Sequence, residues 1–234
     1  MNKSQYRALG VSVLLAKESE IYQFHPLTYF AKCFIPPILL NNFIVDIGND
    51  KCHGIMTWAN INDQVLTKII NTPGYLISGE EWSAGENIFI GDIITNKSSN
   101  KQLMIKLIKT LSKNEPIKVH WQNRTTNSNL DFKYNSTTLP SVDIIPKYYD
   151  CKIEEFNANS IFDTLLVDIG YSLIISLNTA GWSNIALIDF YKLIVENQMI
   201  GKNYLIEFSN NLPTSFVTSN NLLLLDSNLN KPEL

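Results

Sequence analysis

Apolar and polar positions follow two different periods along the first sixty residues. An apolar run spans residues 9–16, and between Ala31 and Ile38 apolar side chains recur every three or four positions, as on one face of a helix. Residues 43–47 and 55–59 are apolar runs of strand length, and the Gly-, Asn- and Asp-containing segment between them predicts a turn. The chain is therefore expected to begin with an apolar segment, a helix and a β-hairpin.

Prolines bracket the predicted helix. Pro26 suits the first helical position, because the N–H that proline lacks has no helical partner there. The residue before a proline avoids helical angles, so His25 is expected at or just outside the cap. Pro36 and Pro37 are expected to end or kink the helix.

The middle of the chain mixes helix-like and strand-like segments. Residues 62–71 have the pattern of a short helix, and residues 74–94 hold two strand-like runs around a connector with glycines. Residues 101–111 are strongly amphipathic, and residues 117–124 alternate as a strand does. This order predicts an α+β fold.

A change in composition marks a candidate domain boundary. Residues 125–150 are rich in Asn, Ser, Thr and Pro, which is typical of a loop or an irregular hairpin. The predicted domains are therefore residues 1–150 and 151–234.

The second predicted domain repeats the pattern of the first at an offset of 160 residues. An apolar run, a loop, a helix and two strands follow one another in the same order. The identical pairs are Gly10 with Gly170, Ser12 with Ser172, Leu27 with Leu187, Phe30 with Phe190, Lys32 with Lys192, and Asn60 with Asn220. The pattern predicts a partial copy that docks on the first domain, because half a domain alone would leave an unpaired sheet edge. Two unrelated α+β segments are the alternative.

Composition and charge narrow the class of protein. Hydrophobic residues make up 45% of the chain and charged residues 18%, which is typical of a globular protein with a sizeable core. The net charge of -3 and the lack of a basic stripe argue against nucleic-acid binding. Three cysteines without CxxC spacing argue against a zinc site or a disulfide framework. No secretory signal and no apolar stretch of roughly 18 residues is seen, so we expect a cytoplasmic protein without a transmembrane segment.

Two short motifs carry a resemblance to a known family. Trp58, Ala59 and Asn60 follow the predicted hairpin; the acidic pair Glu80 and Glu81, then Trp82, Ser83 and Gly85, follow later, and Asp92 lies seven residues beyond that glycine. Over residues 8–125 the sequence resembles the bacterial lysine-acyltransferases that activate RTX toxins. The resemblance implies a GNAT-like, twisted and mostly antiparallel sheet flanked by helices. It also implies that Asp92 is catalytic.

The resemblance further implies a donor and an acceptor. Members of that family transfer a fatty acyl group from acyl-acyl carrier protein to an internal lysine of a protein, so no permanently bound cofactor and no metal is expected. A pyrophosphate-binding glycine loop after the Asp92 strand would suit a coenzyme A donor. Residues 96–100 (NKSSN) stand there instead, which agrees with a carrier-protein donor.

The chain departs from the family pattern at the catalytic base. The family's histidine stands four residues before the proline that precedes the helix, and Tyr22 occupies that position here, whereas a histidine occurs at His25. A lysine amine has a pKa of about 10.4, so a base must help it to lose a proton, and histidine suits that role. A tyrosine is a better general acid toward the leaving thiolate. His25 and Tyr22 are therefore alternative partners of Asp92.

Other candidate residues each have a structural alternative. The resemblance places Ser19 at a functionally implicated serine, and Ser19, Trp58, Asn60 and Trp82 are predicted to bind substrate. The alternatives are loop hydrogen bonding for Ser19 and core packing for the two tryptophans. For Asp92 the alternative is a strand-end carboxylate that caps a turn.

Two functional hypotheses follow. The first is an N-acyltransferase that moves a fatty acyl group from acyl-acyl carrier protein to a lysine or similar amine of a protein toxin or precursor peptide. The second is a degenerate member that binds a carrier protein or peptide without chemistry, which Tyr22 at the histidine position favours. Both hypotheses are compatible with a homodimer.

Overall fold

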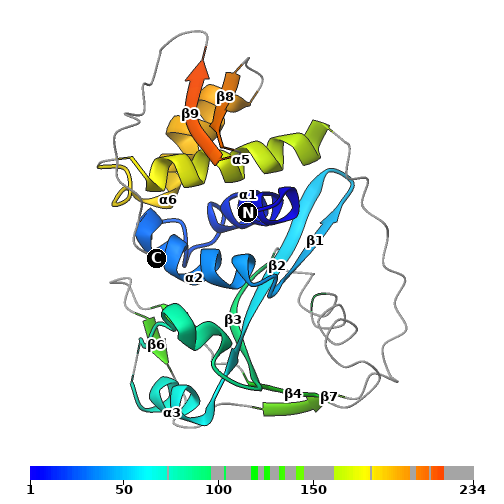
Figure 1. Ribbon diagram of the computed structural model, residues 1–234, viewed down its shortest axis with the longest axis vertical. Coiled ribbons are helices and arrows are strands. Elements are labelled where there is room, and N and C mark those ends of the chain that lie inside the picture. The colour runs from blue at the N-terminus through cyan, green and yellow to red at the C-terminus, as the bar shows by residue number, and fades with distance from the viewer. Residues whose placement is uncertain are drawn as a thin grey trace. The chain divides into compact units, whose positions relative to one another are not determined.

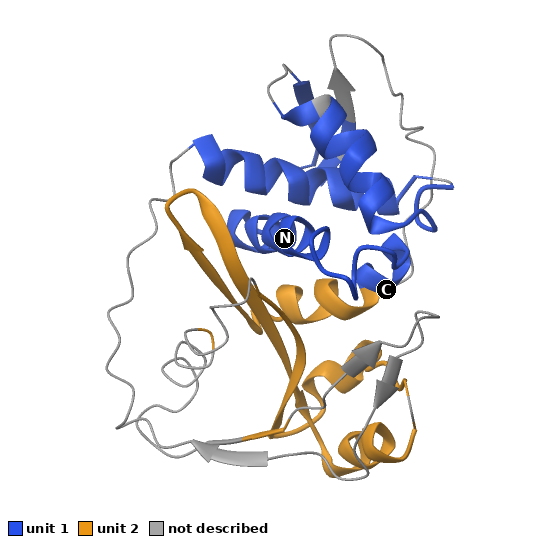
Figure 2. Cartoon of the chain, turned by 180° about the vertical axis from the view of Figure 1, so that it is seen from behind, with its two compact units in different colours: residues 1–31, 157–234 blue, residues 32–156 orange. Residues whose placement is uncertain are grey.

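The computed structural model describes residues 1–72, 74–95, 103, 117–120, 124–126, 132–134, 141–144, 161–179, 181–200, 204–210 and 212–218 (Figure 1). The chain divides into two compact units (Figure 2). Unit 1 comprises residues 1–31 and 157–234, and unit 2 comprises residues 32–156. Unit 1 therefore joins two segments that are far apart in the sequence.

Unit 2 is built on a mixed sheet with the strand order β1-β2-β3-β4-β7. These strands are β1 (Phe43–Gly48), β2 (Lys51–Ile61), β3 (Asn87–Thr95), β4 (Ile117–His120) and β7 (Ser141–Ile144). The β3–β4 pair is parallel, and the other neighbouring pairs are antiparallel. The small hairpin β5 (Arg124–Thr126) and β6 (Phe132–Tyr134) forms a separate two-stranded sheet.

Alternation along β2 sends its side chains into two separate cores. Met56 and Trp58 pack on one face with Ile90 of β3, together with Leu103 and Val119. On the other face, β2 and β3 pack against α3 (Asp63–Asn71) and the 3₁₀ turn η1 (Gly79–Ser83). The residues of this second cluster are Ala59, Ile61, Val65, Ile69, Ile77, Trp82 and Phe89.

Unit 1 is mainly helical. It contains α1 (Lys3–Ala16), α5 (Ile161–Leu177), α6 (Leu187–Phe190), the π-helical stretch η3 (Tyr191–Met199) and the hairpin β8 (Tyr204–Ser209) and β9 (Leu212–Thr218). A capping box opens α1: the Asn2 side chain accepts the Gln5 N–H, and the Gln5 side chain accepts the Asn2 N–H. The apolar runs of α1 and α5 pack against each other (Figure 1). Most residues of α1 and about half of those of α5 are buried.

The helix α2 (Leu27–Leu39) runs through its two prolines, so the first of the two expected outcomes, an end at the prolines, is wrong, and the kink stays a prediction. The helix does not end at Pro36 or Pro37 but continues to Leu39. A proline lacks an N–H but keeps its carbonyl. The Pro36 and Pro37 carbonyls accept the N–H groups of Leu40 and Asn42. The stop comes from Asn41, whose φ of 58° is in the left-handed region that asparagine tolerates.

The predicted α+β class is confirmed. The hairpin expected at residues 43–59 is β1–β2, and the helix expected at 62–71 is α3. Of the two strand-like runs expected in 74–94, the first is irregular up to residue 78 and only the second is a strand, β3. The helix expected at 101–111 lies outside the described residues, apart from Leu103.

Candidate active site

A β-bulge between β2 and β3 holds the candidate catalytic carboxylate. Thr57 pairs with Asp92 and Trp58 pairs with Ile90, so Gly91 is an extra residue opposite β2. Bulges are over-represented beside active sites, because they redirect a side chain and strengthen the local twist. Asp92 is only 4% exposed, and its N–H donates to Thr57 Oγ1 at 3.2 Å. The bulge therefore fixes Asp92 within the sheet, at a position where an ordinary ladder would not place it.

Gly91 lets the Trp82 indole pack against this bulge. A Cβ added at Gly91 would lie 3.2 Å from Thr57 Oγ1 and 3.3 Å from the Trp82 Cη2 and Cζ3 atoms. Those distances are tighter than ordinary van der Waals contacts, so any larger residue would displace a neighbour. Side chains of directly paired residues share one face of an antiparallel sheet, which places Asp92 on the Thr57 and Trp82 side. The two most specific parts of the sequence motif thus meet at one point.

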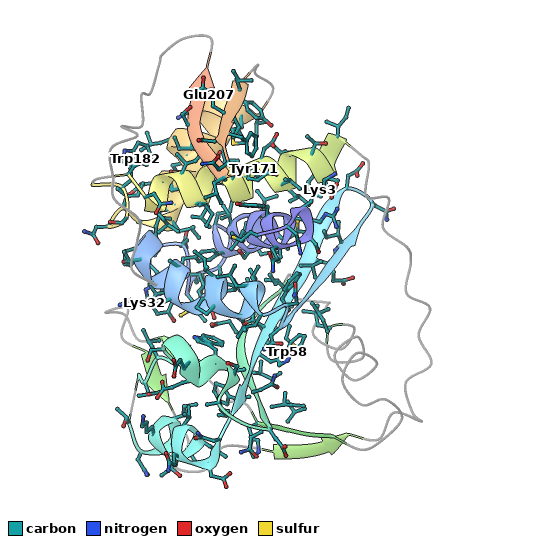
Figure 3. The ribbon with its side chains drawn as sticks, in the orientation of Figure 1. Lys3, Lys32, Trp58, Tyr171, Trp182 and Glu207 are labelled. Carbon is teal, nitrogen blue, oxygen red and sulfur yellow. The ribbon has the colours of Figure 1, made fainter. Side chains whose placement is uncertain are left out.

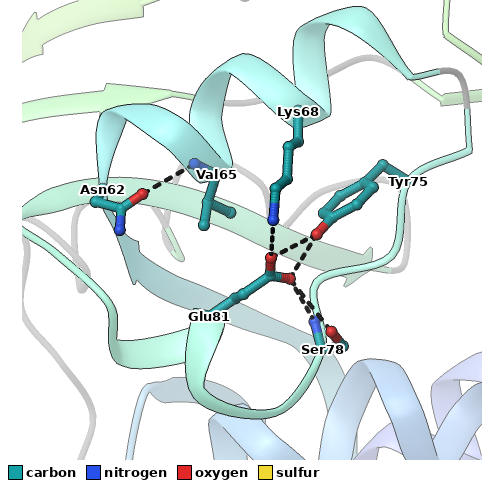
Figure 4. Close-up of polar contacts among 6 residues, drawn as sticks. All are labelled: Asn62, Val65, Lys68, Tyr75, Ser78 and Glu81. Atoms are coloured by element: carbon teal, nitrogen blue, oxygen red, sulfur yellow. Dashed lines mark hydrogen bonds and ion pairs between the residues drawn. The ribbon is translucent and has the colours of Figure 1, made fainter.

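The turn that carries Trp82 is held by Glu81 (Figure 4). The Glu81 carboxylate accepts from Lys68 Nζ at 2.8 Å, from Tyr75 Oη at 2.6 Å, and from the N–H and hydroxyl of Ser78 at 3.2 and 3.3 Å. Burial disfavours the charged carboxylate, but the donors from Lys68, Tyr75 and Ser78 outweigh burial and lower the pKa of Glu81 to about 2. The second glutamate of the acidic pair is therefore a structural clamp on η1.

A second glycine joins this turn to the end of β2. The Gly85 N–H donates to the Asn60 carbonyl at 2.9 Å. A Cβ at Gly85 would lie only 2.6 Å from the Asn62 Cα, so the close approach of the two backbones requires glycine. Asn62 itself caps α3, because its side chain accepts the Val65 N–H at 2.9 Å. The Trp-Ala-Asn motif and the Trp-Ser-x-Gly motif are thus bonded to each other.

The remaining predicted residues lie in unit 1, in the segment between α1 and α2 that we term the first strap (residues 17–26). Ser19 Oγ accepts the N–H groups of Ile21 and Tyr22 at 3.3 and 3.4 Å, which makes a local turn. Tyr22 is 5% exposed, and its carbonyl accepts the His25 N–H. The His25 ring stacks on Tyr29, with ring centroids 4.1 Å apart, and lies 6.5 Å from the Tyr22 ring.

The structure therefore separates the predicted residues into three sets. Asp92 and Trp82 share one face of the sheet in unit 2. Trp58 and Asn60 project from the other face of β2, where Trp58 is buried in the core (Figure 3). The strap residues form a local cluster in unit 1.

Sequence reasoning missed Thr57 and Gly91. Only the register of β2 and β3 gives these two residues their place beside Asp92. A glycine inside a strand-like run is the one signal that could have indicated the bulge.

Comparison with known proteins decides the family. A family model described as the RTX toxin acyltransferase family matches residues 1–134. The chain belongs to that family. The match covers β1–β4 and both motifs around Asp92, and it also covers the first strap, whereas α5 and everything after it lie beyond the match.

A further relative of this acyltransferase-family chain is the uncharacterized protein sll0720 of Synechocystis sp. (strain ATCC 27184 / PCC 6803 / Kazusa). It is 29% identical over 120 residues, which span 50% of this chain and 81% of the relative. Among the described residues, no helix is long and apolar enough to cross a membrane. The same residues contain no group of three or more His, Cys, Asp and Glu side chains placed to hold a metal ion.

Proposed function

We propose that the chain is an N-acyltransferase that moves a fatty acyl group from acyl-acyl carrier protein to a lysine or similar amine of a protein toxin or precursor peptide. The amine nitrogen attacks the thioester carbonyl, a C–N bond forms and the C–S bond breaks. The proton lost by the amine passes to the departing thiolate, so the products are an amide and free carrier thiol.

One observation carries the proposal: a buried carboxylate in a β-bulge, at the position where the family motif places its catalytic aspartate. Asp92, Gly91 and Trp82 are held together by steric fit, and Glu81 holds the turn behind them. A fold that only needed a strand at this point would gain nothing from the bulge, because an extra residue interrupts the ladder.

The proposed division of labour follows from the pKa that each step needs. We assign the uptake of the amine proton to His25 and a catalytic role to the Asp92 carboxylate. Tyr22, which stands at the family's histidine position, donates a proton to the leaving thiolate. Ser19, Asn60 and Trp82 are kept as proposed substrate-binding residues, and Trp82 lies on the sheet face that carries Asp92. Trp58 is buried in the core on the opposite face, which favours its structural alternative. The acyl donor is a cytoplasmic carrier protein, which places the chain in the cytoplasm.

Tyr22 also motivates a second candidate function. A tyrosine is a weak base at neutral pH, so a member without a working histidine would bind a carrier protein or peptide and leave it unmodified. Asp92 would then be a buried structural carboxylate without a part in acyl transfer.

Co-expression separates the two candidates. A candidate acceptor is purified from cells with and without the chain, and its intact mass is measured. Acyl transfer predicts an added fatty acyl mass only when the chain is present. A stable complex with carrier protein or acceptor, at unchanged acceptor mass, would support the binding protein instead.

We further propose that residues 151–234 are a partial copy of the start of domain 1–150. Support comes from the element order. At an offset of 160, α1 corresponds to α5, α2 to α6 with η3, and the hairpin β1–β2 to β8–β9. Ser12 and Ser172 are both buried, and each hydroxyl donates to a carbonyl of the preceding turn.

A further inference from the structure

The helices α1 and α5 contact each other reciprocally. A Cβ on Gly10 would overlap the main-chain carbonyl of Leu166, and a Cβ on Gly170 would overlap that of Tyr6. In the Gly10–Leu166 contact, adding 160 to the residue number in α1 and subtracting 160 from the residue number in α5 gives the Gly170–Tyr6 contact. Such an exchange is the signature of a two-fold axis, and the crossing point lies between the two helices.

The two straps contact each other in the same reciprocal way. The second strap (residues 178–186) lies between α5 and α6, and Pro26 and Ala186 form an antiparallel bridge, again 160 residues apart. The Leu27 N–H donates to the Ile185 carbonyl at 3.0 Å, and the Leu187 N–H donates to the His25 carbonyl at 2.9 Å. These two bonds are two-fold equivalents of each other.

A second pair of bonds, from the starts of α2 and α6 to the opposite straps, obeys the same rule. The Thr28 N–H donates to the Ser183 carbonyl and the Ile188 N–H to the Gln23 carbonyl, both at 2.9 Å. Four main-chain bonds and two helix contacts thus obey one two-fold operation within unit 1. Contacts between unrelated segments have no reason to exchange in this way.

We propose that α1 and the first strap form a self-complementary docking surface whose natural partner is a second copy of the same module. In this chain the C-terminal copy, α5 and the second strap, fills that surface within the same molecule. The chain is a single-chain pseudo-dimer and does not use this surface to associate with another chain.

Only one half of the pseudo-dimer carries the candidate chemistry. Trp182 (labelled in Figure 3) and Ile185 stand in the second strap at the positions that Tyr22 and His25 have in the first. The Leu187 N–H at the start of α6 bonds to the His25 carbonyl, so the part of the second copy is to position the first strap. The inference rests on contacts within unit 1 and stands whether or not the chain transfers acyl groups.

The test displaces the C-terminal copy in the full-length chain, so that α1 and the first strap become exposed. In Gly170→Leu, the new side chain would overlap the Tyr6 carbonyl, so α5 can no longer pack on α1. Gly10 and the first strap are unchanged in this variant. Positions 26 and 186 pair across the two-fold axis, so two chains that dock through their first straps would bring both positions 26 together. We expect Pro26→Cys/Gly170→Leu to give a disulfide-linked dimer as the main species after oxidation with copper phenanthroline, on a non-reducing gel.

Two matched controls complete the test. Pro26→Cys/Gly10→Leu loses the same packing but also spoils the first copy, so it should stay at the background set by the native cysteines. Pro26→Cys/Ala186→Cys, without either glycine change, should form a disulfide inside one chain and remain monomeric, because paired residues of an antiparallel bridge lie within disulfide reach. Equal cross-linking of the two glycine variants, no cross-linking of the Gly170 variant, or a failure of the within-chain disulfide would each overturn the proposal.

Discussion

At the scale of single residues, the site depends on how tightly Asp92 is held. Its N–H is bonded to Thr57, and the residue before it leaves no room for a side chain. Small displacements matter in such a site, because a misplacement of about 1 Å can cost on the order of 10²-fold in rate.

Gly91→Ala tests this tight fit. The added methyl group would push on Thr57 and Trp82 and shift Asp92 by a few tenths of an ångström, so we expect about a ten-fold lower rate of acyl transfer with the fold retained. Gly48→Ala is the matched control, because its Cβ would meet His53 Nε2 at an ordinary 3.5 Å. Equal rates for both variants would show that the geometry at the bulge does not limit the reaction.

Two substitutions in the first strap show which residue is the general base that accepts the amine proton. If His25 accepts the amine proton, His25→Ala should lower the rate by about 10²–10⁴-fold, whereas Tyr22→Phe should have the smaller effect. Rates are measured at saturating donor and acceptor between pH 6 and pH 9. The opposite order would assign the base role to Tyr22, and negligible losses from both would favour the binding-only protein.

At the scale of elements, the Glu81 clamp on η1 predicts a pH dependence of stability. The folded-state pKa of about 2 lies below the ordinary value of 4.5, so the charged carboxylate stabilises the fold above about pH 4.5. That contribution is lost as the pH falls toward 2. Glu81→Gln should therefore lower the free energy of unfolding at pH 7, and the difference from the native chain should shrink between pH 4.5 and pH 2.

Urea unfolding at a series of pH values measures this difference. Glu80→Gln is the control, because Glu80 is exposed and its removal changes the net charge equally. A Glu81→Gln difference that stays constant with pH would contradict the proposed electrostatic clamp.

The helix pair α1–α5 gives a second prediction at this scale. Gly10→Ala and Gly170→Ala should destabilise the chain by similar amounts, because each methyl group overlaps an equivalent main-chain carbonyl. We expect a loss of about 1–3 kcal/mol from overpacking, reduced by about 1 kcal/mol of helix propensity. Ser4→Ala on the exposed side of α1 is the control. Thermal or urea unfolding checks the result, and a large difference between the two glycine variants would count against a two-fold relation.

Elements that rest on local signals could be predicted, and those that rest on tertiary contacts could not. The hairpin β1–β2 and helix α3 follow from apolar period and turn chemistry. The turn η1 depends on Lys68, thirteen residues before Glu81, so the strand-like pattern of residues 74–78 was misleading. The bulge depends on the register of two strands, so Asp92 was predicted from the motif but its contact with Thr57 was not.

At the scale of the whole molecule, the sequence gives the α+β class but not the grouping of its parts. Residues 1–31 join residues 157–234 in one compact unit, and no periodicity signal reports contacts between segments so far apart. The constant offset of 160 residues was the only sequence signal of this grouping. The proposed repeat rests on the exchanged hydrogen bonds that the first residues of α2 and α6 make with the opposite straps.

The family match covers the part of the chain that carries Asp92 and the first strap, so we propose that this part transfers the acyl group. The most direct measurement is the rate at which an acceptor gains acyl mass from acyl-acyl carrier protein, compared between Asp92→Asn and Asp50→Asn. Both variants lose one negative charge, and Asp50 lies exposed in the β1–β2 turn with a φ of 52° that asparagine accepts. We predict a loss of about 10²–10⁴-fold for Asp92→Asn and an unchanged rate for Asp50→Asn. A native rate in the Asp92→Asn variant would contradict the account.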